Sequence, residues 1–183
     1  MDRRALLKSI AIITGASVVG GDLLLLGCKS TTDNNGLFSP GDVTLMDEIA
    51  ETILPETDIP GAKAAGVGAI MAVMVKDCYS VDQQMAFVDG LKELDAASTK
   101  ALGKSYLEAT ADERQEFLIR VDQDAKAAMQ EGSSHYFTMI KQLALFGYFT
   151  SEIGATQALR YVQVPGRYEG CIPYTRGEKA WAL

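Results

Sequence analysis

The side chains that could carry out catalysis are few in this chain of 183 residues. Its single histidine, His135, is the one candidate base for a serine or cysteine nucleophile. Because His135 stands at the expected start of a helix, we interpret it as a hydrogen-bonded or capping residue. The grouped carboxylates lie on polar faces of expected helices, where exposure to solvent is the ordinary outcome. We therefore predict no catalytic residue; the acidic groups set aside are Asp112, Glu113 and Glu116, and Asp122 with Asp124.

Cofactor and metal motifs are also missing from the sequence. The three cysteines lie far apart, which excludes CxxC redox pairs, haem attachment, zinc clusters and iron–sulfur loops. The glycines of 61–66 open a helix after a proline turn and have no βαβ context, so they form no dinucleotide fingerprint. A net charge of −7 without a basic stripe argues against a nucleic-acid partner. We predict no cofactor-binding and no metal-binding residue in this chain.

The N-terminus has the pattern of an export signal. Arg3 and Arg4 precede an apolar run over residues 10–26, and an arginine pair before such a run is typical of a twin-arginine signal. The alternative is a membrane-spanning anchor, but the run has 17 residues and Asp22 interrupts it. We expect residues 1–27 to be a signal that exports the protein already folded.

The end of this signal resembles a lipobox. Leu25 and Leu26 precede Gly27 and Cys28, so a small residue stands before a thiol that can carry diacylglycerol. The alternative is a cysteine that follows an apolar run by coincidence. Several acyl chains would hold the mature protein stably at a membrane. We therefore expect a lipid-anchored protein on the periplasmic side of a bacterial membrane, with residues 28–38 as a flexible tether.

Residues 39–160 carry the signals of a helical domain. Three capping boxes start helices, and apolar residues follow at helical spacing; the pairs are Ser39 with Asp42, Ser80 with Gln83, and Thr110 with Glu113. Further helices are expected over residues 62–79 and 134–149, with Gly147 at a close approach to another backbone. No segment alternates like a strand. The predicted fold is all-α, with about five or six helices.

The last part of the chain, residues 161–183, cannot continue this helical pattern. Residues 161–174 contain two prolines, two glycines and three tyrosines. The aromatic content also makes them a poor linker, because these side chains favour a surface to lie on. We predict an extended arm, and two interpretations stay open: it wraps its own domain, or it embraces a partner.

Two cysteines, Cys78 and Cys171, are left once Cys28 is lipidated. In an oxidising compartment they most simply pair with each other, which would tie the arm to the second helix. The alternatives are a disulfide from Cys171 to a partner, or two free buried thiols.

Two stretches resemble a known family. Ile-Leu-Pro-Glu-Thr-Asp-Ile-Pro-Gly-Ala over residues 53–62, followed by Ala65-Gly66-Val67, is similar to a signature of the gluconate 2-dehydrogenase subunit 3 family. Residues 149–154, Tyr161 and residues 165–171 resemble the C-terminal segment of that family. The resemblance covers the chain from about Phe38 to Tyr174.

The resemblance implies a non-catalytic small subunit. Its partner would be a large FAD-containing flavoprotein of the glucose–methanol–choline type, which oxidises sugars, gluconate or glycosides outside the cytoplasm, and a haem c subunit often completes the complex. The small subunit would then escort the folded, FAD-loaded partner through twin-arginine export. The lipobox is a departure from many relatives and implies a membrane anchor as well. The competing hypothesis is a stand-alone helical lipoprotein that acts as an envelope scaffold or binds a small ligand.

The family context also suggests which residues meet the partner. In the loop before the second helix, Thr57 and Asp58 can bond to nearby backbone N–H groups, and two prolines restrict the chain. One interpretation is a rigid loop with Asp58 capping the next helix; the other is a loop that contacts the flavoprotein. The predicted interface comprises Pro55, Thr57, Asp58, Pro60, Gly61, Tyr161, Pro165, Arg167, Tyr168 and Tyr174.

Overall fold

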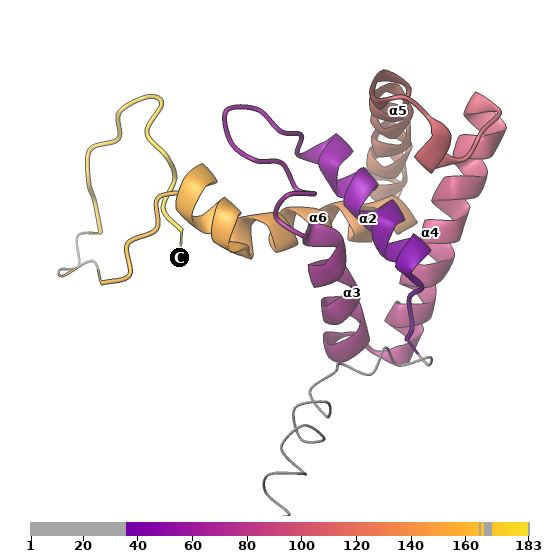
Figure 1. Ribbon diagram of the computed structural model, residues 1–183, viewed down its shortest axis with the longest axis horizontal. Helices are drawn as coiled ribbons and strands as arrows, with labels where there is room; N and C mark the ends of the chain where they lie inside the picture. The colour runs from indigo at the N-terminus through magenta and orange to yellow at the C-terminus, as the bar shows by residue number, and fades with distance from the viewer. Residues whose placement is uncertain (1–35, 165, 167–169, 183) are drawn as a thin grey trace, which may run out of the picture. The chain divides into compact units, whose positions relative to one another are not determined.

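The computed structural model describes residues 36–164, 166 and 170–182, and in these residues it is helical without a strand (Figure 1). The α-helices within these residues are α2 (Pro40–Ile53), α3 (Val67–Cys78), α4 (Val81–Leu102), α5 (Ala111–Gln130) and α6 (Tyr136–Thr150). A 3₁₀ turn, η1 (Tyr106–Glu108), follows α4, and a π-helical turn, η2 (Gly154–Ala158), follows α6. The predicted all-α class is confirmed. Arg3, Arg4, Gly27, Cys28, Pro165, Arg167 and Tyr168 lie outside the described residues.

The predicted helix starts at residues 39, 80 and 110 are confirmed, because each cap satisfies backbone groups that a helix end leaves free. The Ser39 hydroxyl accepts from the Asp42 N–H at 3.2 Å, and the Asp42 carboxylate accepts from the Ser39 N–H at 2.7 Å. Ser80 with Gln83 and Thr110 with Glu113 form the same reciprocal pair.

The second helix is shorter than predicted. It begins at Val67 instead of residue 62, because Gly66 adopts the left-handed conformation with φ of +67°. An αL residue cannot continue a right-handed helix, so residues 62–66 form turns ahead of α3. No helix in the part of the chain that the structure describes is both long and apolar enough to cross a bilayer.

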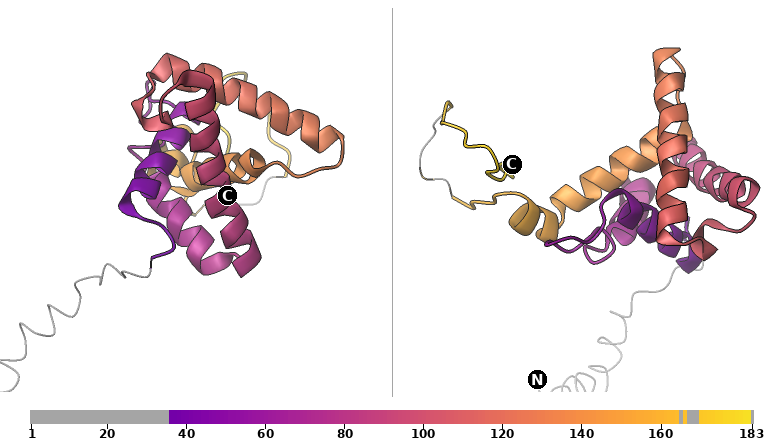
Figure 2. Two further views of the ribbon diagram at one scale, coloured as in Figure 1. Left: turned by 90° about the vertical axis from the view of Figure 1, so that its right-hand side faces the viewer. Right: turned by 90° about the horizontal axis from the view of Figure 1, so that it is seen from above.

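Helix α6 is the centre of the fold and packs against α2, α3, α4 and α5 (Figure 2). One face buries Phe137, Ile140 and Ala144, and Gly147 lies where α3 crosses. A Cβ added at Gly147 would lie 3.3 Å from a Val67 methyl carbon. The predicted close approach is thus present, but the neighbours of Gly147 are side chains of α3 instead of a backbone.

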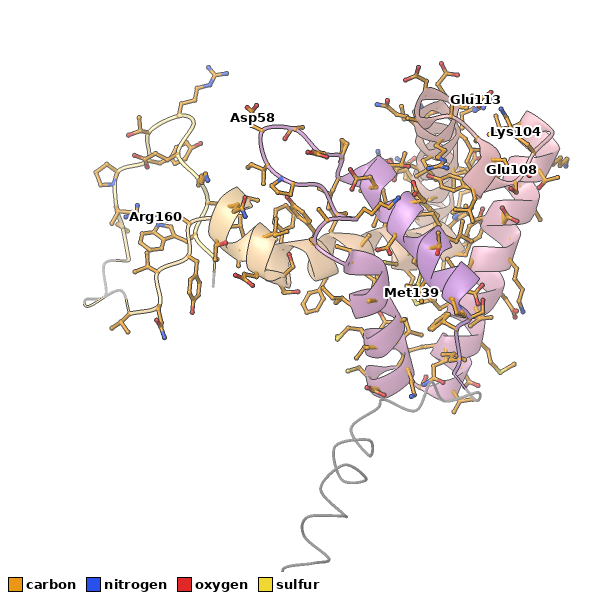
Figure 3. All side chains as sticks on the ribbon, in the orientation of Figure 1. Asp58, Lys104, Glu108, Glu113, Met139 and Arg160 are labelled. Carbon is orange, nitrogen blue, oxygen red and sulfur yellow. The ribbon has the colours of Figure 1, made fainter. Side chains whose placement is uncertain are left out.

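Glu113, in the first turn of α5, forms an ion pair with Lys104, which precedes the helix. This pair should make the stability of the fold sensitive to acid. The Glu113 carboxylate accepts from Lys104 Nζ at 2.7 and 2.9 Å and from the Thr110 N–H at 2.8 Å (Figure 3). These hydrogen bonds, that of Lys104 first, lower the pKa of Glu113 from 4.5 to about 2. A lowered carboxyl pKa stabilises the folded state above the unfolded pKa, and this contribution is lost as the pH falls from 4.5 to about 2.

We therefore expect wild-type protein to lose more thermal stability over that pH window than Glu113→Gln, which keeps a capping side chain but has no charge to lose. Melting temperatures from circular dichroism at several pH values measure the difference. The control is Glu116→Gln, which removes a charge from an exposed position on the same helix. Parallel pH curves for wild type and Glu113→Gln would contradict this account.

Candidate partner interface

The loop between α2 and α3, residues 54–66, is held in shape by the carboxylate of Glu51. Glu51 Oε1 accepts from the Glu56 N–H at 2.9 Å, and Oε2 accepts from the Lys63 N–H at 2.8 Å. Gly61 lies directly against this carboxylate, since an added Cβ would be 2.3 Å from Oε1. Gly61 is buried, so its place in the loop signature reflects the room that Glu51 needs.

One further contact fastens the loop to a helix, and another closes the base of the loop. The Tyr148 hydroxyl on α6 donates to the Pro60 carbonyl at 2.9 Å, and the Ala62 N–H donates to the Leu54 carbonyl at 3.0 Å. At the start of α3, the Gly68 N–H donates to Asp47 Oδ1 at 2.7 Å. The loop is therefore tied to α2 through Glu51 and to α6 through Tyr148, and Asp47 of α2 holds the start of α3.

A second carboxylate of α2, that of Glu48, links the loop to α5. This carboxylate pairs with both Lys63 and Arg114, and these partners, the hydrogen bond from Lys63 first, lower the pKa of Glu48. Asp47, Glu48 and Glu51 together form the acidic support of the loop, which the sequence analysis did not identify. Their spacing on α2 is that of an ordinary solvated helix face, so the sequence held no distinctive signal for this role.

The tip of the loop projects its side chains into solvent. Pro55, Thr57 and Asp58 are exposed, and the tip is closed by a hydrogen bond from the Thr57 N–H to the Ile59 carbonyl at 3.0 Å. Figure 3 shows Asp58 at this outer turn. Asp58 does not cap α3, whose N-cap is Gly66, so the capping interpretation is wrong. The tip is a hydrogen-bonded, solvent-facing element.

Glu51→Gln should loosen the loop locally. The amide nitrogen of glutamine would face one of the two N–H donors, so either Glu56 or Lys63 would lose its acceptor. A hydrogen bond to a charged group contributes about 1.5–3 kcal/mol, so exchange of the orphaned amide should rise roughly tenfold to a hundredfold. Hydrogen–deuterium exchange measures this change. Asp58→Asn is the control, because it removes the same charge at the exposed tip; equal exchange in the two variants would refute the role of Glu51.

The arm, residues 161–183, begins shortly after η2, the turn that follows α6 (Figure 2). Its described side chains are exposed almost throughout, including Tyr161 at 53%, Tyr174 at 74% and Trp181 at 42%. Of the two interpretations of the arm, wrapping its own domain does not match this exposure. Among the described residues, eight large apolar side chains are exposed on the last turns of α6 and on the arm: Phe146, Phe149, Tyr161, Val162, Val164, Ile172, Tyr174 and Trp181.

The loop and the beginning of the arm both fall inside a match to a known family. The sequence model described as gluconate 2-dehydrogenase subunit 3 matches residues 40–166. The chain belongs to the gluconate 2-dehydrogenase subunit 3 family. The expected resemblance is thereby confirmed, although the match stops at Gly166, within the arm. Neither the curated proteins nor the solved structures gave a match. Membership in this family implies a place in a multi-subunit dehydrogenase complex.

The cysteines of this subunit 3 family member do not form the predicted bond. Cys78 and Cys171 are both free and exposed, so neither the Cys78–Cys171 disulfide nor the alternative of buried thiols matches the structure. Cys78 is the last residue of α3, and Figure 1 shows this end of α3 well apart from the arm. A disulfide needs Cα atoms within about 7 Å. A bond from Cys171 to a partner stays a prediction.

His135 has the structural role expected of it. It is the N-cap of α6, and its Nδ1 accepts from the Phe137 N–H at 3.2 Å. Among the residues with described positions, no three His, Cys, Asp or Glu side chains are placed to hold a metal ion. Of the predicted interface residues that the structure describes, those of the loop tip and of the arm face outward.

Proposed function

We propose that this chain is the non-catalytic small subunit of a periplasmic dehydrogenase complex. Its catalytic partner is an FAD-containing flavoprotein of the glucose–methanol–choline type, acting as a sugar, gluconate or glycoside 3-dehydrogenase. FAD belongs to that partner, and a cytochrome c subunit with haem c passes the electrons onward. The chain carries the folded partner through twin-arginine export and anchors it to the membrane through lipid on Cys28.

The observation that carries this proposal is the exposed aromatic arm in a member of a dehydrogenase subunit family. Soluble monomers seldom expose large contiguous apolar surface, and such patches commonly mark interfaces. Tyrosine, tryptophan and arginine dominate the energy of protein interfaces, and the described arm with its first neighbour Arg160 is rich in them. The loop tip with Pro55, Thr57 and Asp58 supplies a second contact with the same partner.

Purification of the tagged chain from its native membrane fraction tests the proposal. We expect a flavin absorption spectrum and a co-purifying dehydrogenase subunit identified by mass spectrometry. Activity on glucose, gluconate and glycosides with an artificial electron acceptor should follow the complex. A colourless, solitary protein would reject the proposal in favour of a stand-alone helical lipoprotein.

Export and anchoring are tested separately. Arg3→Lys with Arg4→Lys should leave both this chain and the flavoprotein in the cytoplasm, because the twin-arginine receptor reads the arginine pair. Cys28→Ser should instead permit export and release the complex from the membrane. Cell fractionation with dehydrogenase assays measures both effects. Unchanged export of the flavoprotein in the double lysine variant would contradict the escort role.

A further inference from the structure

The two ends of the arm meet at its base. The Arg160 N–H donates to the Ala180 carbonyl at 2.7 Å, and the Ala182 N–H donates to the Arg160 carbonyl at 3.0 Å. Arg160 and Trp181 are thus paired as an isolated bridge between segments twenty-one residues apart. We name Arg160 with Ala180, Trp181 and Ala182 the C-terminal clasp (Figure 3 labels Arg160).

Side chains reinforce the C-terminal clasp. The Arg160 guanidinium lies over the Trp181 indole, with 4.2 Å between Cζ and the ring centroid, which is close enough for a cation–π interaction. Lys179 Nζ donates to the Gln157 carbonyl in η2, so the returning end of the arm is bound to the helical turn as well. The described residues at the two ends of the arm are therefore joined at its base.

The net charge of the arm with Arg160 is opposite in sign to that of the helical domain. Residues 39–159 carry nine basic and nineteen acidic side chains, a net charge of −10. Residues 160–183 carry four basic and two acidic side chains, a net charge of +2. The arm and its neighbour Arg160 combine this charge with exposed apolar side chains at Tyr161, Val164, Ile172 and Tyr174. Such a surface complements a partner that is apolar at the centre and acidic at the rim.

We infer that the C-terminal clasp preforms the arm as a docking loop for an acidic-rimmed apolar surface of the catalytic dehydrogenase subunit. This inference rests on the proposed function. A loop whose ends are already joined loses less conformational freedom on binding than a free tail, and this preorganisation raises affinity. The returning half of the loop lies beyond the family match, so the clasp is a feature of this chain that the match does not cover.

Trp181 is the only tryptophan in the chain, and it therefore reports on the clasp directly. In the isolated, full-length mature chain, Arg160→Ala should increase acrylamide quenching of Trp181 and lower its fluorescence anisotropy. Arg176→Ala is the matched control, since it removes an exposed positive charge from the arm outside the clasp. Equal quenching in the two variants would overturn the clasp.

Binding of each variant to the purified dehydrogenase subunit tests the docking role. We expect Arg160→Ala to raise Kd roughly tenfold more than Arg176→Ala, while circular dichroism shows unchanged helicity. Trp181→Ala should weaken binding in the same way, and Trp181→Phe, which keeps an aromatic face, should restore most of the affinity. Equal affinity of wild type, Arg160→Ala and Trp181→Ala would overturn this inference alone.

Failure of the proposed function has a different signature. If the wild-type chain binds no dehydrogenase subunit, the proposed function fails and the docking role fails with it, even where quenching still reports a closed clasp. If sedimentation shows a dimer of this chain that Arg160→Ala dissociates, the loop serves a second copy, and the inferred partner is wrong.

Discussion

Removal of residues 161–183 is expected to abolish association with the dehydrogenase subunit, with a rise in Kd of at least about a hundredfold. The deletion takes away Tyr161, Tyr174 and Trp181, and interface aromatic residues often contribute 2 kcal/mol or more each. Pull-down and titration against the purified flavoprotein measure this loss.

The same deletion should leave the helical domain folded, because the described side chains of the arm are exposed and contribute little to the core. Helicity and the melting temperature serve as the check on folding. Met129→Ala is the control for apolar surface, since Met129 is exposed on α5 and lies outside the arm and loop. Undiminished association of the truncated chain would place the interface on another surface.

Tyr106→Ala is expected to lower the free energy of unfolding by about 3–5 kcal/mol, the usual cost of removing a buried aromatic side chain. Tyr106 is fully buried in η1, with its ring centroid 6.2 Å from that of Phe117. Its hydroxyl donates to Thr52 Oγ1 at 2.8 Å, and Arg114 lies over the ring. The ring therefore joins η1 to α2 and α5, and its loss leaves a cavity between them.

Tyr106→Phe is the matched variant, because it keeps the ring and removes only the hydroxyl. The loss should be about 1 kcal/mol, since the Thr52 hydroxyl still donates to the Glu48 carbonyl. Burial raises the pKa of Tyr106 to about 12, so the hydroxyl stays protonated and the difference should not vary between pH 6 and about pH 9. Chemical denaturation of the three proteins measures both changes. A similar cost for the two substitutions would mean that the hydroxyl, and not the ring, provides the stability.

The acidic support of the loop shows why part of the candidate interface could not be predicted. Asp47, Glu48 and Glu51 lie on a helix with ordinary charge spacing, and a solvated face is the expected interpretation of such residues. Only the turn of the chain at residues 54–66 brings the Glu56 and Lys63 amides to Glu51. The disulfide prediction failed for the related reason that distance through space cannot be read from cysteine count.

The helix starts, the N-cap role of His135 and the irregular arm were determined by the sequence itself. Each depends on a side chain and a backbone group only two to four residues apart, or on proline and glycine, whose restrictions are local. The tertiary structure alone decided the contacts between distant residues. Tyr148 and Pro60 are 88 residues apart, and Arg160 meets Trp181 across the whole described arm. Such contacts depend on the path of the folded chain, which no local pattern contains.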